Sequence, residues 1–341
     1  MHAGTLPETL VLPVSPGSLA RLEAIGPWPA HLPSDLVSTW LAPDGPFLRR
    51  GAAAIVLVGD RAGWLLSHDP AVQDEPFVAF SGLRVASGCE GDERLDILFA
   101  LVAASRSWAL ERGVKRLLGP IFLNTWLPYR VLERDWGPVA FPFPGETVEP
   151  PHRQEDYRLM GLEVTDRFVS RYLEKRNPPW WWMDLVEKWL RRGARVTIRT
   201  LESGELPPLL PAVYRLVLET FSRNAHFSPI APTEFASLLA GGPTTGAIHL
   251  GAFDPEGALV GFCTGHVHEG VGILKTVGVV PSHRNTRLGM GLTFQFHREL
   301  LKRGLGQAVH ALMKDDNASN RMSGRVARTM RTYVLHGCTL D

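Results

Sequence analysis

The chain has 341 residues, 45% of them hydrophobic and 21% charged, which is typical of a globular protein with enough apolar material for a core. Its 36 Lys and Arg and 35 Asp and Glu leave a net charge of +1, so no global charge attracts nucleic acid or an anionic membrane. At roughly 150 residues per domain, the length predicts two domains.

Three further observations concern the compartment. The N-terminal residues lack the basic and apolar regions of a signal peptide. No apolar run approaches the ~18 residues of a membrane-spanning helix. The three cysteines, Cys89, Cys263 and Cys338, are isolated and match neither a disulfide framework nor a zinc-site spacing. We therefore expect a cytoplasmic protein without a membrane span or a metal site.

Apolar alternation in the first half predicts an antiparallel meander, followed by an amphipathic helix and another strand. The strands are expected at 54–58, 64–66, 77–85 and from Lys115, and the helix from Asp96 to Arg112. The span 122–153 is rich in proline and aromatic residues, which favours a functional loop or lid.

A boundary is expected near the middle of the chain. Pro179 suits the first position of a helix, and Trp180, Trp181 and Trp182 follow it. At least one of these tryptophans is expected to pack between two halves or to lie on the surface. We divide the chain into a domain at 1–175, a linker helix at 176–193 and a domain at 194–341.

From Ala194 the patterns predict the order β-α-α-β-β-β-loop-α-β-α-β. The strands are expected at 194–199, 247–253, 259–264, 273–280, 308–313 and 331–335, and the helices at 208–223, 233–239, 288–303 and 317–328.

The most informative segment lies at 276–292. An apolar, β-branched run stops at Pro281, a short basic loop follows, and a helix begins near Leu288. Loop amides and the positive end of the helix dipole make a socket for a pyrophosphate, and Arg284 and Arg287 add two cations. An ordinary strand-to-helix turn with a solvated basic loop is the alternative. The segment is neither a Walker loop nor a dinucleotide fingerprint.

This segment resembles the acyl-CoA loop of the GNAT (Gcn5-related N-acyltransferase) superfamily, which reads V-x-x-P-x-x-[RQ]-x-x-G-x-[GA]. Pro281, Arg284, Leu288 and Gly289 fit the pattern, and Arg287 stands where the family usually has its first glycine. The element order from Ala194 is also similar to the GNAT fold.

The resemblance implies an α/β (α+β) fold with two GNAT-like domains, each a mixed, mostly antiparallel sheet flanked by helices. The whole chain is similar to the tandem-GNAT proteins of bacteria. The loop equivalent in the first half, 86–94, carries acidic residues that would repel an anionic cofactor. We therefore expect a degenerate N-terminal domain that supports the structure and forms a wall of the acceptor site.

The resemblance also implies a donor site for acetyl-CoA, another acyl-CoA or an acyl carrier protein thioester. The strand residues Val277, Val279 and Val280 would bind the pantetheine through their main chains. The diphosphate would be held by Arg284, Asn285, Thr286, Arg287, Leu288, Gly289 and Met290. Asn317 would contact the pantetheine arm, cap the final helix, or do both.

The reaction needs a base for the amine and an acid for the thiolate. His266, His268 and Glu269 are candidate bases, although an exposed hairpin explains them equally well. The tyrosine that many family members use as the acid is absent, because its position holds Gly324, and Tyr333 is a weak substitute.

Substrate-binding candidates follow the first helix of the second half and lie in the aromatic span of the first. They are Asn224, His226, Ser228 and Trp126.

The leading hypothesis is an acyl-CoA-dependent N-acyltransferase that transfers an acetyl or longer acyl group to an amine of a small molecule or peptide. An aminoacyl-tRNA-dependent (Fem-like) transferase and a non-catalytic acyl-CoA sensor remain as alternatives. The near-zero net charge argues against the tRNA reading.

Overall fold

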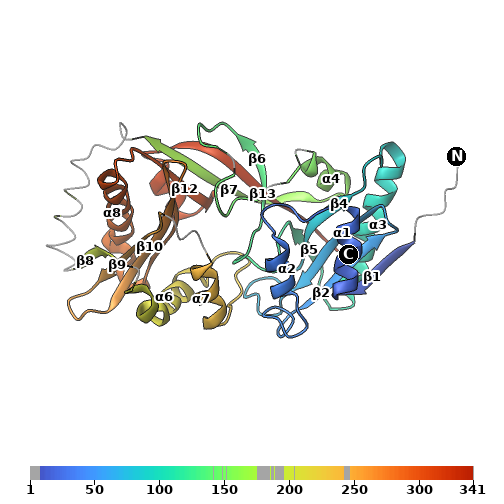
Figure 1. Ribbon diagram of the computed structural model, residues 1–341, viewed down its shortest axis with the longest axis horizontal. Coiled ribbons are helices and arrows are strands. Elements are labelled where there is room, and N and C mark those ends of the chain that lie inside the picture. The colour runs from blue at the N-terminus through green and yellow to red at the C-terminus, as the bar shows by residue number, and fades with distance from the viewer. Residues whose placement is uncertain are drawn as a thin grey trace.

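The computed structural model describes residues 8–140, 142–147, 149–150, 152–174, 185, 188, 196–202, 204–241 and 246–340. Their strands form one mixed sheet in the order β1-β2-β3-β4-β5-β13-β7-β12-β11-β10-β9-β8, with β6 beside β13. The molecule is elongated, with β1 and α3 near one end of its long axis and β8, β9 and α8 near the other (Figure 1). No helix within these ranges has the length and apolar character that crossing a membrane requires.

The N-terminal half contains the expected meander, helix and strand. Its elements are β1 (Thr9–Pro13), α1 (Pro16–Ile25), α2 (Ser34–Trp40), β2 (Ala52–Val58), β3 (Ala62–His68), β4 (Val78–Val85), α3 (Gly91–Leu110), β5 (Arg116–Gly119), β6 (Val131–Asp135), α4 (Arg153–Leu159) and β7 (Glu163–Glu174). The sequence patterns did not predict β1, α1 or α2. Helix α3 begins earlier than expected, so Asp92 and Glu93 lie in its first turn rather than in a loop.

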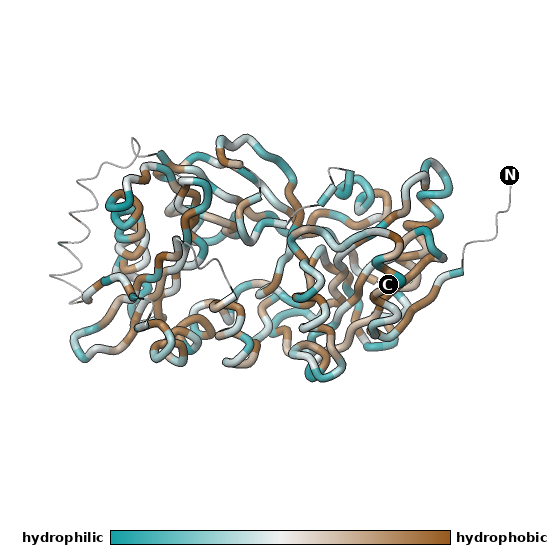
Figure 2. The backbone as a smooth tube through the Cα atoms, in the orientation of Figure 1, coloured by the Kyte–Doolittle hydropathy of each residue, from teal (hydrophilic) through white to brown (hydrophobic). Residues whose placement is uncertain are grey.

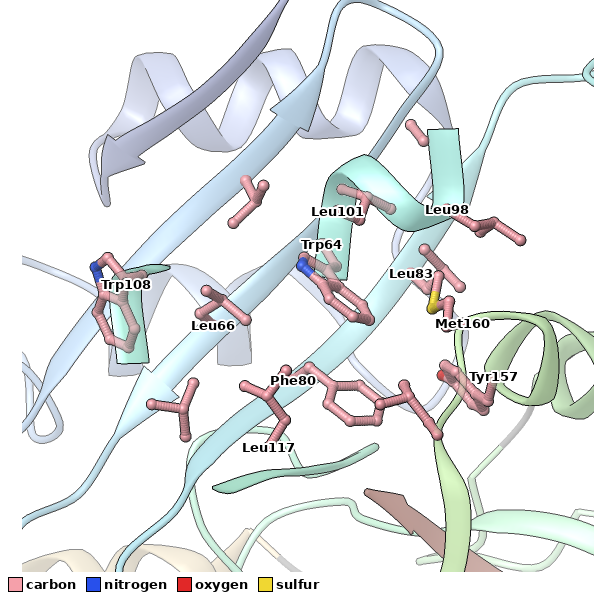
Figure 3. Packing of buried hydrophobic residues seen from close by; sticks show 14 of the residues in the cluster. Trp64, Leu66, Phe80, Leu83, Leu98, Leu101, Trp108, Leu117, Tyr157 and Met160 are labelled. Carbon is pink, nitrogen blue, oxygen red and sulfur yellow. The ribbon is translucent and has the colours of Figure 1, made fainter. Parts of the chain in front are cut away.

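The core of this half packs large aromatic side chains among aliphatic ones (Figure 3). Trp64 stacks on Phe80 with ring centroids 4.9 Å apart, and its indole N–H donates to Ser105 Oγ at 3.0 Å. The same cluster includes Val334 and Leu340 from the far end of the chain. Figure 2 shows long apolar stretches along the strands inside this half. The N-terminal core is therefore completed by C-terminal residues.

The C-terminal half has the predicted element order. Its elements are β8 (Thr197–Thr200), α6 (Leu206–Phe221), α7 (Pro232–Ala240), β9 (Ile248–Phe253), β10 (Leu259–His268), β11 (Val271–Val279), the 3-10 turn η2 (Pro281–Thr286), α8 (Leu288–Lys302), β12 (Gln307–Lys314), α9 (Ala318–Ser323) and β13 (Arg328–Thr339). Helix α8 packs on one sheet face through Leu292 and Phe296. Helices α6 and α7 contribute Leu216 and Phe235 to a cluster around Phe262 of β10.

Two long strands cross between the halves. β7 and β13 pair antiparallel along most of their length. The end of β13 pairs with β5, and the end of β7 pairs with β12. Each half therefore receives a strand from the other, and the C-terminus lies beside the N-terminal elements (Figure 1). The domain division stays a prediction. The expected linker helix 176–193 lies outside the described residues except for Leu185 and Lys188, and so do Trp180, Trp181 and Trp182.

Candidate functional site: two clefts that meet where a strand pair separates

The parallel pairing between β11 and β12 is short. Its registered pairs are Gly272–Ala308, Ile273–Val309 and Leu274–His310. Beyond Leu274, β11 continues to Val279 with no registered partner on β12. The two strands therefore separate, and this part of β11 presents backbone groups to a gap on its β12 side.

A β-bulge in β11 and an irregularity in β12 accompany the separation. On β10, Thr264 pairs with Thr276 and the next residue, Gly265, pairs with Leu274, so Lys275 is an additional residue in β11. On β12, the register against β7 shifts between His310 and Met313. Because bulges bend a strand and increase its twist, the two strands diverge from this point.

Leu312 lies within the irregular part of β12 and has a φ of +58°, which strains a branched residue. Both of its backbone groups are held. Its N–H donates to Ser170 Oγ at 3.2 Å, and its carbonyl accepts from Arg130 Nη1 at 2.9 Å. Side chains from the N-terminal half therefore fix the bend that opens the gap.

The gap opens into a cavity of about 520 Å³, which we call the splay cleft. Its lining comes from β11, the basic loop, the first turns of α8, β12 and α9. These residues include Leu274, Lys275, Thr276, Val277, Val279, Arg284, Arg287, Gly289, Met290, Thr293, His310, Ala311, Met313, Ser319 and Met322.

A second cavity, of about 650 Å³, lies beside α6 and α7, and we call it the α6 cleft. Trp126 and Tyr129 of the N-terminal half and Phe221, Asn224 and Phe235 of the C-terminal half line it. The two clefts share a wall, whose residues are Lys275, Thr276, Val277, Ala311, Met313 and Ser319. Two ligands, one in each cleft, would therefore meet at the β11 bulge.

The basic loop is suited to an anion. Helix α8 is 15 residues long, and its N-cap residue, Arg287, makes no side-chain capping hydrogen bond. The positive end of the helix dipole can therefore attract an anion. Arg284 and Arg287 both line the splay cleft. Arg284 Nη2 also donates to the carbonyls of Glu219 and Thr220 at 3.3 and 3.4 Å, which fixes it at the C-terminal end of α6.

Arg287 adopts the left-handed conformation, with φ 58° and ψ 14°. This is the region that glycine enters without strain, and the GNAT pattern has its first glycine at this position. The loop therefore makes a glycine-type turn with an arginine, at a cost on the order of 1–2 kcal/mol.

Only some of the predicted donor-site residues line the splay cleft. Those that line the splay cleft are Val277, Val279, Arg284, Arg287, Gly289 and Met290. Leu288 has its side chain fully buried in the core, so only its backbone is available. Asn317 lines the α6 cleft, and its side chain accepts from Asn320 N–H at 2.7 Å as the N-cap of α9.

Two other donor-site residues, Val280 and Thr286, lie apart from the lining of the splay cleft. Val280 follows β11 and packs against the core, and Thr286 Oγ1 donates to His283 O at 2.6 Å. Nothing is described for the side chain of Asn285.

Lys275, which the sequence analysis did not select, lies in the wall that both clefts share. Burial and the charge of Arg130 lower the pKa of its ammonium to about 8, although Glu146 opposes the shift. Its Nζ lies 5.8 Å from the centroid of the Phe143 ring. A lysine in the middle of a buried strand was the available signal in the sequence.

The segment beside Lys275 is held by charges from β13. Arg331, which is fully buried, donates from Nη1 to Glu146 Oε2 at 3.2 Å and bonds the carbonyl of Val139. Glu146 Oε2 also accepts from Phe143 N–H at 3.0 Å, and burial raises the pKa of Glu146. The position of Lys275 therefore depends on a strand that begins in the C-terminal half.

Neither Tyr333 nor the histidine candidates line the two clefts. Tyr333 is fully buried, and its hydroxyl bonds Glu146 and Ser170, the latter at 3.1 Å. His266 is buried on β10 opposite Ile273, and burial lowers its pKa to about 4. His268 and Glu269 lie at the β10–β11 hairpin, where β11 begins rather than where it leaves β12.

Two of the four substrate candidates line the α6 cleft, and two lie behind its wall. Trp126 and Asn224 are in the lining. His226 is buried, with Nε2 3.0 Å from Asp166 Oδ2. Ser228 is buried as well, and its carbonyl accepts from Trp126 Nε1 at 2.7 Å. His226 and Ser228 therefore hold the wall in place and do not line the cavity.

A second group that the sequence analysis missed follows the point of separation. His310 Nδ1 lies 2.6 Å from Ser323 Oγ, and His310 Nε2 lies 2.9 Å from His297 Nε2. Burial lowers the pKa of His310 to about 4 and that of His297 well below its usual range. Both rings are therefore neutral near pH 7. Within the described ranges, no cluster of His, Cys, Asp or Glu is arranged to hold a metal.

The fold is that of the GCN5-related N-acetyltransferases over nearly the whole chain, as the sequence predicted. Such an enzyme from Sphaerobacter thermophilus is 17% identical, with a TM-score of 0.50, and the match covers 98% of this chain and 97% of that one. Another, from Kribbella flavida, is 12% identical with a TM-score of 0.55 and covers 98% and 72%. A third, from Anabaena variabilis, is 9% identical with a TM-score of 0.57 and covers 98% and 73%. No protein-family model matches the chain, and no curated protein matches it significantly.

Proposed function

We propose that the protein is an acyl-CoA-dependent N-acyltransferase. The observation that carries the proposal is the wall around Lys275 that the splay cleft and the α6 cleft share. The splay cleft would bind the donor, with its diphosphate at the N-terminus of α8 beside Arg284 and Arg287. The α6 cleft would bind the acceptor, an amine of a small molecule or peptide.

The proposal assigns the residues as follows. The acyl thioester supplies a carbonyl carbon and a thiolate leaving group. The unpaired edge of β11 after Leu274 orients the donor through backbone groups. Lys275, in its neutral form, accepts the proton that the amine loses as the C–N bond forms. The resulting ammonium returns that proton to the thiolate when the C–S bond breaks, which leaves Lys275 neutral again.

The proposal also covers organisation and location. The unit at 194–341 would carry the donor site, and the unit at 1–175 would provide Trp126 and Tyr129 as a wall of the acceptor site. We expect the protein to act in the cytoplasm. The acceptor lining is aromatic on several sides, which favours amines with an apolar or aromatic body.

Release of free thiol from acetyl-CoA and octanoyl-CoA, measured with a panel of amines and short peptides, tests the proposal. We expect turnover with at least one amine class, and a loss of about 10²- to 10⁴-fold in kcat for Lys275→Met. The rate of the unmodified protein should rise with pH through about 8 as Lys275 becomes neutral, and the variant should lack this rise.

The control is Lys115→Met, because Lys115 is exposed in the N-terminal half, and its activity should be unchanged. Binding of CoA without any thiol release would identify a binding protein instead of an enzyme. Absence of CoA binding would contradict the proposed donor site itself.

A further inference from the structure

A third cavity, of about 320 Å³, lies between α8, α9 and the end of β7, and we call it the α8 cavity. It adjoins the splay cleft, since Met290, Thr293, His310 and Met322 line both. His310 is the last residue of β12 that pairs with β11. The α8 cavity therefore lies beside the point where the strands separate, close to the β11 bulge.

The lining of the α8 cavity offers little to a polar ligand. Leu173, Phe294 and Val326 complete an apolar surface with the two methionines. The buried polar side chains of the lining have partners inside the protein. Thr293 Oγ1 donates to Gly289 O at 2.9 Å, and Ser323, His310 and His297 are joined in one chain of contacts. Burial keeps both imidazoles neutral. Arg325 also lines the cavity, but it is an exposed residue, so its charge stays in contact with solvent when an apolar group enters.

We propose that the α8 cavity holds the hydrocarbon chain of a medium-chain acyl donor. This inference rests on the proposed function, because it places the chain of the same thioester whose diphosphate lies at α8. An enclosed apolar space of about 150 Å³ accommodates a benzene molecule. By that scale the α8 cavity takes roughly eight to twelve carbons. An acetyl group would leave it unfilled.

Calorimetric titration with CoA, acetyl-CoA and octanoyl-CoA tests the inference without needing the acceptor. Octanoyl-CoA carries six more methylenes than acetyl-CoA, and burying only two of them strengthens binding about 16-fold, at about fourfold each. We expect octanoyl-CoA to bind at least tenfold more tightly than acetyl-CoA by this estimate. A series up to palmitoyl-CoA should reach its optimum at about eight to twelve carbons.

Two variants test where the acyl chain of the donor binds. Val326→Phe fills the cavity from a position outside the splay cleft, and it should remove the octanoyl preference while leaving the affinity for CoA unchanged. Phe294→Ala enlarges the cavity and should move the optimum to longer chains. Val11→Phe, at an exposed position of β1, is the control and should change neither. Circular dichroism confirms that each variant is folded.

The outcomes separate the two proposals. If CoA binds but acetyl-CoA and octanoyl-CoA bind equally, the chain does not occupy the α8 cavity, and the proposed function stands. If octanoyl-CoA binds more tightly than acetyl-CoA and the folded Val326→Phe variant keeps that preference, the acyl chain binds outside the α8 cavity. If none of the three thiols and thioesters binds, the donor site itself is refuted.

Discussion

Gly145 keeps the space that the Lys275 side chain occupies. Its φ is +94°, and a Cβ placed on it would clash with Lys275 Nζ. The residue therefore meets two constraints, one on the backbone and one on packing. Because Lys275 lies between the two clefts, its position depends on a loop of the N-terminal half that is itself fixed by Arg331.

Gly145→Ala should displace Lys275 as well as strain the backbone. We expect a loss of stability of about 1–3 kcal/mol, together with a lower rate and a shifted pH dependence near pH 8. Gly161→Ala is a matched control, because Gly161 also has a positive φ (74°) but nothing lies near its Cβ position. Urea unfolding and pH–rate profiles measure the two effects. An unchanged pH–rate profile in Gly145→Ala would mean that Gly145 does not determine the position of Lys275.

His310 makes stability depend on pH. Burial, together with the charge of Arg171, lowers its pKa to about 4 in the folded protein, against about 6.5 in an unfolded chain. The unfolded chain therefore binds more protons below pH 6.5, so this contribution to stability is complete above pH 6.5 and is lost as the pH falls toward 4. At pH 5 the loss amounts to about 2 kcal/mol.

Urea unfolding at pH 7.5 and pH 5.0 measures this dependence. The decrease in unfolding free energy between the two should be about 2 kcal/mol smaller in His310→Asn. His152→Asn, at an exposed residue, should behave like the unmodified protein. An equal decrease in all three proteins would mean that His310 is not the responsible group.

At the scale of elements, the loop between β11 and α8 combines strain with charge. Arg287→Gly removes the left-handed strain and one cation of the proposed diphosphate site. We therefore expect an increase in stability of about 1 kcal/mol and a loss in CoA affinity of roughly tenfold. Arg284→Ala should weaken CoA binding without the gain in stability, since Arg284 is not in the left-handed region. Thermal unfolding and calorimetry measure the two quantities, and stronger CoA binding by Arg287→Gly would contradict the assignment.

Local sequence patterns were sufficient to predict the elements around the loop. The β-branched run before Pro281 and the apolar periodicity after Leu288 indicated β11 and α8, because both signals depend on neighbouring residues. The cavities were not predictable in this way. They depend on the bulge at Lys275 and on the bend at Leu312, which is held by Ser170 and Arg130 from distant parts of the chain.

The same distinction explains which candidate residues face the clefts. Arg284 and Arg287 belong to the loop that the motif marks, and both line the splay cleft. Tyr333 and His226 were chosen for their chemistry alone, and each is instead engaged in a buried contact with a carboxylate. Lys275 was overlooked, because an interruption of an apolar strand by lysine is informative only if the strand is buried on both faces.

At the scale of the whole molecule, β7 and β13 join the two halves into one sheet. β13 begins beside the C-terminal half and ends against β5. Between these points, its residues Arg331 and Tyr333 bond the carboxylate of Glu146. One strand therefore supports the loop beside Lys275 and also contributes to the N-terminal core. Because each half lacks a strand without the other, we expect the described parts of the chain to unfold as a single unit.

Leu340→Ala, near the C-terminus, tests whether the two halves unfold together. Leu340 is buried in the N-terminal core, and its N–H donates to the carbonyl of Lys115 at 2.8 Å. The substitution should lower the unfolding free energy by about 2–4 kcal/mol, whereas Leu159→Ala, at a more exposed leucine of α4, should have a small effect. Hydrogen exchange followed by mass spectrometry should show the same loss of protection in peptides of β3 and of β10, because unfolding of one half leaves the other without a sheet strand. Loss of protection confined to the N-terminal peptides would show that the halves unfold separately despite the exchanged strands.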